Sequence, residues 1–249
     1  MHTLKTALLL SLLVFVLQAC ASHGAVKKSA PDTGTAALPQ NNGDIGWRAA
    51  VFTIAWPAGQ APVWHADAFL AHRVFSGILE LHEQDLALWR FHRRAVDDAS
   101  GHQFSFRFYA DSVLAQTIYQ EIRNHPETAR LLEAGILTNI RYRPLAENDR
   151  PQIADTSDPG WSPEMQASWP YFAMGVSRSW LALIDQVSVN SLPAAAGEPL
   201  DTQLAFYESV NDRVTRHWRT EGGHAYLHHL NALFGYEEIL VRERRSTRF

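Results

Sequence analysis

The sequence predicts an α+β protein, with a ferredoxin-like β-α-β-β-α-β antiparallel sheet and a helical C-terminal extension packed on it. Two observations lead to this prediction. Apolar and polar side chains alternate along residues 88–109, which is the period of a half-buried β-hairpin. A segment of helical period and a further strand-like segment lie on each side of this hairpin. We therefore expect two helices on one face of a single sheet.

Each element of this α+β sheet domain, residues 46–143, has its own signals. Asp67 is a candidate N-cap of the first helix. Asn124-His125-Pro126 is expected to break the second helix, because the residue before a proline avoids helical geometry. Gly135 fits the position just after a helix. The expected elements are strand 46–56, helix 67–84, hairpin 88–109, helical segment 111–134 and strand 136–143.

Residues 144–249 are predicted to be mainly helical and to form one globular unit with residues 46–143. After a polar connection, Ser168 is the expected N-cap of a long helix and Asp201 the cap of the next one. Gly222-Gly223 is expected to interrupt that second helix near Trp218. A short helix, 224–234, and a last strand, 236–243, complete the list of expected elements.

The hairpin has two contrasting sides. Its aromatic side, which we expect to face the helices, consists of Trp89, Phe91, Phe104, Phe106 and Phe108. The predicted ligand-binding residues on the other side are Arg90, His92, Arg107 and, by alternation in the last strand, Arg141. Several guanidinium groups on one face suit a carboxylate or phosphate ligand, and the tryptophan-rich C-terminal helices are expected to roof them. The alternative is a solvated sheet face, or ion pairs with acidic residues of the covering helices.

The C-terminal histidines offer a second candidate site. His224 and His228 are four residues apart, so a helix places both imidazoles on one side, as a metal site would require. A third ligand would have to come from His217 or Glu221. The alternative is a set of histidines on a solvated helix. The sequence predicts no other cofactor.

Catalytic motifs are incomplete. His82-Glu83 begins like a zinc-protease motif, but Leu86 stands where the second histidine belongs. Gly175-Val-Ser177 lacks the second glycine of a nucleophile elbow. There is no phosphate-binding loop and no dinucleotide fingerprint. The sequence therefore predicts no catalytic residue.

Composition narrows the class of protein. The chain has 249 residues, of which 46% are hydrophobic, enough for a sizeable core. Its formal net charge of −4 gives no overall field that would attract nucleic acid. Cys20 is the only cysteine, so a disulfide within the chain is excluded.

The N-terminus carries the strongest motif. Lys5 precedes an apolar run over residues 7–17, and Leu17-Gln18-Ala19-Cys20 follows. This ending resembles the lipobox of bacterial lipoprotein precursors. The resemblance implies that residues 1–19 are a signal peptide, that Cys20 carries a diacylglyceryl thioether and an acylated amino terminus, and that Ala21 favours the outer membrane. The alternative is an ordinary signal peptide with an incidental cysteine.

Residues 20–45 are expected to be the lipidated cysteine followed by a flexible tether, since they are rich in Ala, Ser, Gly, Pro and Asn. Such a chain spans about 25–30 Å on average. Because each buried CH₂ adds about 0.8 kcal/mol, two or three acyl chains would make a stable anchor.

Taken together, the sequence predicts a non-enzymatic lipoprotein anchored in the bacterial outer membrane, with its body facing the periplasm. Its expected partner is a small anionic ligand or a protein of the envelope. One alternative is a periplasmic hydrolase or metal-dependent enzyme that uses the Arg/His sheet face or the C-terminal histidines. The other is a structural subunit of an envelope assembly, which would expose its tryptophans at an interface.

Overall fold

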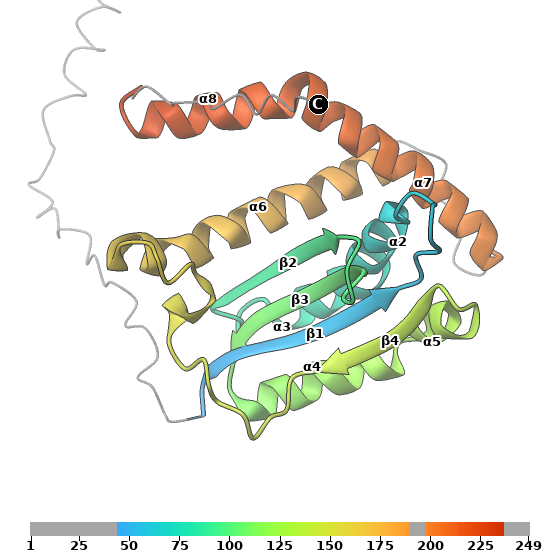
Figure 1. The fold of residues 1–249 in the computed structure, drawn as a ribbon, viewed down its shortest axis with the longest axis horizontal. Coiled ribbons are helices and arrows are strands. Elements are labelled where there is room, and N and C mark those ends of the chain that lie inside the picture. Colours follow the sequence, from blue (N-terminus) through green and yellow to red (C-terminus); the bar gives the residue numbers. More distant parts are fainter. Residues whose placement is uncertain (1–43, 190–197, 237–249) are drawn as a thin grey trace, which may run out of the picture. The chain divides into compact units, whose positions relative to one another are not determined.

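A four-stranded antiparallel sheet organises the part of the chain that the computed structural model describes, residues 44–189 and 198–236. The strands lie in the order β2-β3-β1-β4, and every neighbouring pair is antiparallel (Figure 1). The protein is therefore α+β, as the sequence predicts. The strands are β1 (Gly46–Ile54), β2 (Leu88–Ala95), β3 (His102–Ala110) and β4 (Leu137–Tyr142).

Helices connect and follow these strands. Between β1 and β2 the chain forms one helical segment with a π-helical middle: α2 (Trp64–Phe69), η1 (Leu70–Phe75) and α3 (Ser76–His82). Between β3 and β4 lie α4 (Ser112–Asn124) and α5 (Pro126–Glu133). After the sheet come the 3₁₀ turn η2 (Ile153–Thr156), α6 (Pro163–Val189), α7 (Leu200–His217), the π-helical turn η3 (Trp218–Gly222) and α8 (Gly223–Leu233).

The aromatic side of the hairpin faces the helices, as predicted. Phe104, Phe106 and Phe108 are fully buried. The ring of Phe75 in η1 lies 4.7 Å from that of Phe106, and the ring of Tyr119 in α4 lies 5.8 Å from that of Phe108. Both helical connections therefore cover the same face of the sheet, and burial of these large rings supplies much of the hydrophobic stabilisation.

Helix α6 runs beside β2 at the edge of the sheet (Figure 1). The Ser177 hydroxyl accepts a hydrogen bond from the Phe91 amide at 3.0 Å, and the Trp180 ring lies 5.9 Å from the Phe91 ring. Helix α7 packs on the helical layer, where the Tyr207 hydroxyl is 2.7 Å from Nδ1 of His72. These helices cover mainly an edge strand and the helical layer, and on the polar face α6 reaches only the end where Met174 packs against Trp47, Leu88 and Tyr109. The expectation that they roof the arginines is therefore wrong.

Several predicted boundaries are confirmed. The helical segment after β3 is divided at His125, which has extended geometry immediately before Pro126. Gly135 adopts a left-handed conformation with φ 69° directly after that segment. In the hairpin loop, Oδ1 of Asp98 accepts hydrogen bonds from the amides of Ser100 and Gly101, so this aspartate shapes the turn.

Four helix predictions are wrong. Asp201 is no N-cap, because α7 begins at Leu200 and Pro199 occupies the cap position. Asp67 is no N-cap: the helix begins three residues earlier, and Asp67 is buried inside it. The long helix begins at Pro163 and not after Ser168, because the Ser162 hydroxyl already accepts from the Met165 amide. Gly222-Gly223 does not interrupt the last helix, since η3 joins α7 to α8 with helical geometry at both junctions.

Some apolar residues of these helices lie outside the core. Leu81 and Val113 are exposed, and so is Leu132.

None of the described helices has the length and apolar character needed to cross a membrane. The predicted signal peptide, Cys20, the predicted tether up to residue 43, and all but the first residue of the predicted strand 236–243 lie outside the described residues. Asp44 and Ile45, the last two residues assigned to the tether, are described and contact the body, where Asp44 accepts from Ser112.

Candidate functional site

The polar face of the sheet carries a cluster of arginines, which we call the arginine face: Arg90, His92, Arg94, Arg107, Arg141, Arg143 and Arg150. Strand pairing arranges most of them in rows. In the first row, Arg90 of β2 lies opposite Arg107 of β3, and Arg107 lies opposite Ala49 of β1. Arg143 completes this row, because its amide donates to the Ala49 carbonyl at 2.9 Å. The next row holds His92, Ser105, Val51 and Arg141. Residues opposite one another in a sheet have their side chains on the same face.

Arg107 is the central and least satisfied member. Its side chain is half-buried, and its Nε has no hydrogen-bond partner among the described residues. Within those residues it forms no ion pair either. Desolvation, followed by the charges of Arg90, Arg150 and Arg143, lowers the pKa of Arg107 to about 10. The guanidinium is therefore still cationic at neutral pH, in surroundings that disfavour its charge.

The neighbours of Arg107 are only partly compensated. Arg90 donates to the Thr156 carbonyl at 3.3 Å, and its Nε has no partner in the described chain. Burial, and then the charge of Arg150, lowers the pKa of Arg90. Arg143 is paired with Asp149. The cluster therefore contains more cations than anions, although the chain as a whole has a formal net charge of −4.

A loop holds one end of the arginine face. The Trp47 indole donates to the Ile153 carbonyl at 2.9 Å, and the Tyr109 hydroxyl donates to the Pro151 carbonyl at 2.6 Å. Together with the bond from Arg90, these contacts dock the segment around η2 onto the sheet and bring Arg150 to the cluster. Beyond this loop, His92 and Arg141 are exposed.

His92 adds a titratable group to the arginine face. Desolvation, then the charges of Arg107, Arg90 and Arg94, lowers its pKa. The imidazole is therefore neutral at pH 7 and offers a hydrogen-bonding group beside the guanidinium groups. An anion bound nearby would oppose the effect of the arginines and raise the pKa of His92.

On the opposite face, buried polar groups form a second cluster around Asp67. Nε of Arg93 donates to Asp67 at 2.7 Å, and Nε2 of His102 is 3.1 Å from the same carboxylate. The Arg93 guanidinium lies between the rings of Trp64 and Trp180, 4.9 and 4.8 Å from their centroids. The side chains of Asp67 and His102 are fully buried, so the cluster ties α2 to the sheet rather than meeting a substrate.

A cavity of about 790 Å³ borders this second cluster. Its lining includes Trp64, Arg93, Asn211, Asp212, Arg216 and Arg219. Arg93 is already held there by Asp67 and by the side-chain oxygen of Asn211. The charge of Arg93 is therefore compensated within the protein, unlike that of Arg107, and the other two arginines of the lining, Arg216 and Arg219, are exposed to solvent.

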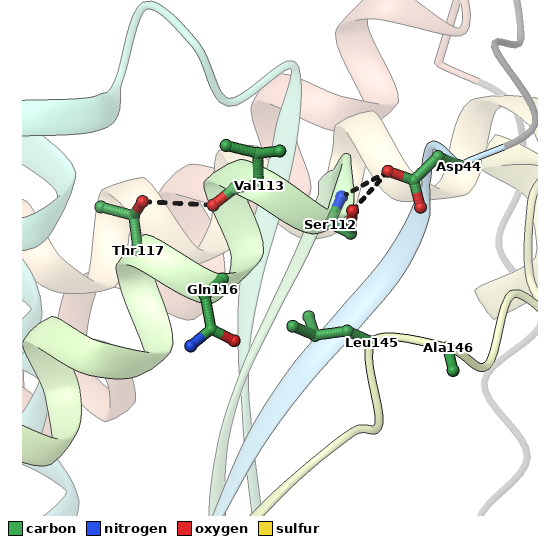
Figure 2. Close-up of a pocket in the computed structure, with 7 residues that line it drawn as sticks. All are labelled: Asp44, Ser112, Val113, Gln116, Thr117, Leu145 and Ala146. Carbon is green, nitrogen blue, oxygen red and sulfur yellow. Dashed lines mark hydrogen bonds between the residues drawn. The ribbon is translucent and has the colours of Figure 1, made fainter.

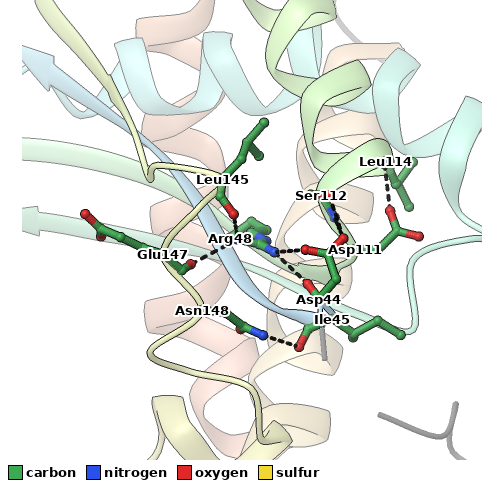
Figure 3. A network of polar contacts seen from close by, with 9 residues as sticks. All are labelled: Asp44, Ile45, Arg48, Asp111, Ser112, Leu114, Leu145, Glu147 and Asn148. Carbon is green, nitrogen blue, oxygen red and sulfur yellow. Dashed lines mark hydrogen bonds and ion pairs between the residues drawn. The ribbon is translucent and has the colours of Figure 1, made fainter. Parts of the chain in front are cut away.

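A third polar network surrounds Arg48 at the start of β1 (Figure 3). The Arg48 guanidinium, whose side chain is fully buried, donates to the carbonyls of Leu145 and Glu147, each at 3.0 Å, and to the carbonyl of Asp44 at 2.7 Å. The Asp44 carboxylate in turn accepts from the amide and hydroxyl of Ser112, at the start of α4. The Arg48 guanidinium therefore has a structural role, because its hydrogen bonds hold segments of the chain together and leave it buried.

A shallow cavity of about 580 Å³ lies next to this network, between α4 and the loop after β4 (Figure 2). Asp44, Ser112, Gln116 and Leu145 are among its lining residues. The polar groups at its rim already bond to one another, because Asp44 accepts from Ser112. It offers no unpaired cationic group to an anion.

The structure brings Arg90, His92 and Arg107 together, and Arg141 lies in the row of His92. Arg94, Arg143 and Arg150 were missed, although Arg94 continues the alternation of Arg90 and His92. Arg143 continues the alternation of Arg141 and was accessible to sequence reasoning, whereas no pattern announces that the loop returns Arg150 to the sheet.

The rings of His224 and His228 stack at 5.6 Å on α8. Across the described ranges, no group of three or more His, Cys, Asp or Glu side chains is placed to hold a metal ion.

No protein-family model, curated protein or solved structure matches this chain. The arginine face is therefore the candidate site that the geometry itself distinguishes.

Proposed function

We propose that this protein is a non-enzymatic envelope lipoprotein that binds an anionic ligand on the arginine face. The observation that carries the proposal is Arg107, a half-buried cation that forms no hydrogen bond and no ion pair with any described residue and has other arginines around it. Buried or half-buried cations are normally paired, because desolvation without a partner is costly. A bound anion would accept hydrogen bonds from the Arg107 guanidinium, which no described residue does.

The ligand that suits this face has more than one carboxylate or phosphate group. Arg90 and Arg107 are paired across neighbouring strands, and Arg143 lies two strands further on, beyond Ala49 of β1. Adjacent strands are about 4.8 Å apart, so these guanidinium groups form a row wider than a single small anion. A planar guanidinium binds carboxylate or phosphate through two parallel hydrogen bonds, which gives direction as well as charge.

Inorganic pyrophosphate, titrated into the purified chain by calorimetry, tests this proposal. We expect binding, and we expect Arg107→Gln to weaken it about 10- to 100-fold, since a hydrogen bond to a charged group is worth about 1.5–3 kcal/mol. Orthophosphate should bind more weakly, because it reaches fewer of the arginines.

Arg178→Gln is the matched control. Arg178 is an exposed arginine of α6 that pairs with Glu83, away from the arginine face. Its replacement should leave pyrophosphate binding unchanged. Absence of binding to the wild-type chain, or equal losses in the two variants, would refute the arginine face as an anion site.

The membrane anchor is a separate part of the proposal and has its own test. The lipobox-like ending at Cys20 supports lipid attachment there, in the outer membrane with the body in the periplasm. Metabolic labelling with a palmitate analogue should mark the protein in a Gram-negative host, and Cys20→Ser should abolish the label. Wild-type protein without label would contradict the anchor.

We also propose that the sheet and its two helical connections have the ferredoxin-like arrangement. In support, β3 lies between β1 and β2, and β1 lies between β3 and β4, so each helix connects strands that are separated by one other strand. An experimentally determined structure with another strand order would contradict it.

A further inference from the structure

Helix α8 is unusual because it has no buried residue. A helix of this length is marginal in water by itself, and most helices in proteins are stabilised by packing an apolar side. Here the helix continues from α7 through η3, and α7 does pack on the body through Tyr207 and Val210. The chain therefore extends a helix beyond its own core.

The exposed residues of this extension are largely aromatic and aliphatic. Their exposed fractions run from 46% for Tyr226 to 73% for Phe234. Tyr226, Leu230 and Leu233 follow the helical repeat, and Leu227 and Phe234 adjoin them, while His224, His228 and Asn231 form the other side. His229 adjoins Leu233, so the helix has a mainly apolar side that one histidine borders, and this side lies outside the core.

Two arginines precede this helix and also line the cavity beside Asp212. Arg216 and Arg219, just before α8, are exposed and form no ion pair within the described residues. The one acidic residue between Arg219 and Tyr236, Glu221, lies 3.5 Å from His217. An aromatic and aliphatic side flanked by arginines is the chemistry of helices that lie in the interface of an anionic bilayer.

The size of the surface favours a bilayer over a second protein. The 16 or so residues of η3 and α8 form a helix about 24 Å long and about 10 Å wide, which presents roughly 240 Å² on one side. A stable protein complex buries about 800 Å² on each partner. A bilayer imposes no such minimum, because it needs no complementary shape.

We propose that α8 lies on the surface of an anionic lipid bilayer, with Tyr226, Leu227 and Phe234 in the headgroup region. This inference rests on the proposed function only for how the chain reaches a membrane. Binding by α8 itself does not need the anchor at Cys20, so the two can fail separately.

A fluorescent label that responds to polarity tests the inference on the full chain. In the Cys20→Ser background, Leu227→Cys places a nitrobenzoxadiazole label on the apolar side, and Ala225→Cys places it elsewhere on the exposed helix. With vesicles of equal parts phosphatidylcholine and phosphatidylglycerol, emission at position 227 should rise about twofold or more, shift to the blue and be quenched by lipids brominated in their acyl chains. The label at position 225 should respond much less.

A second variant tests the role of charge. In Arg216→Gln/Arg219→Gln, the lipid concentration for half-maximal response at position 227 should rise roughly 10- to 30-fold, because each arginine near an anionic surface contributes about 1 kcal/mol. Far-UV circular dichroism checks that the variants keep their helix content.

Three outcomes would overturn the inference. One is no response to vesicles at position 227, and another is an equal response at positions 225 and 227. The third is a blue shift without vesicles: if it grows with protein concentration the surface binds a second copy, and if it does not, the chain covers α8 itself. The palmitate label tests the anchor independently of all three.

Discussion

Arg48 in β1 and Arg107 in β3 lie in neighbouring strands on opposite faces of one sheet. Arg48 is buried and its guanidinium donates to three backbone carbonyls. The Nε of both side chains has no partner in the described chain, but Arg107 is only half-buried and none of its nitrogens forms a hydrogen bond or ion pair with a described residue. An arginine side chain therefore serves two different purposes in the same sheet. Where the chain supplies acceptors, an arginine joins segments, and where it does not, the arginine is available to something else.

The largest effect should come from the covered face. Arg48→Met keeps a similar volume but leaves the carbonyls of Leu145, Glu147 and Asp44 without their donor. We expect the free energy of unfolding to fall by about 3–5 kcal/mol, since the substitution removes three partly buried hydrogen bonds from a charged group, each worth about 1.5–3 kcal/mol. Urea denaturation measures it. A loss below about 1 kcal/mol would mean that Arg48 is not the structural arginine of the pair.

An intermediate effect is expected on acidification. Desolvation is the main cause that lowers the pKa of His65, His72 and His125 in the helical layer, and of His92 on the arginine face. Below about pH 6.5 the unfolded chain takes up protons that the folded chain does not, so stability falls as pH falls and is unaffected above that range.

Because these side chains are partly exposed, we expect a total loss of about 1–2 kcal/mol between pH 7.5 and about pH 5. Urea denaturation at the two pH values measures it. His92→Gln should keep most of the loss, since three of the four histidines lie in the helical layer. If His92→Gln removed the loss, the acid sensitivity would belong to the arginine face.

The smallest effect should come from Arg107→Met, the same substitution on the other face. It removes a cation that burial and neighbouring arginines disfavour. We expect the free energy of unfolding to change by less than about 1 kcal/mol, with stabilisation as the favoured sign. A loss comparable to that of Arg48→Met would show that Arg107 has a structural partner and would weaken the case for a ligand.

The sequence predicts best what local periodicity determines. Alternation in the hairpin was enough to place Phe104 and Arg107 on opposite faces, and Pro126 and Gly135 marked where helices end. These features depend on the chain within a few residues of each position, which is the range that a pattern reports.

What the sequence could not predict depends on distant partners. Asp67 has the composition of an N-cap, but Arg93 and His102 hold it inside a helix. Two successive glycines usually end a helix, but at Gly222-Gly223 the helix continues, because it extends from the well-packed α7. At the candidate site, the position of Arg150 depends on how a loop returns to the sheet, and no local pattern encodes that return.

The bond from the Phe91 amide to the Ser177 hydroxyl has a consequence for assembly in concentrated solution. An outer strand with free amides is a template on which further chains add, and long polymers grow in this way. Here α6 lies along the outer strand β2, so a second chain could pair with this strand only after displacing a 27-residue helix. Ser177→Ala keeps the helix but frees that amide, which makes this position the first place to look for slow polymerisation on storage.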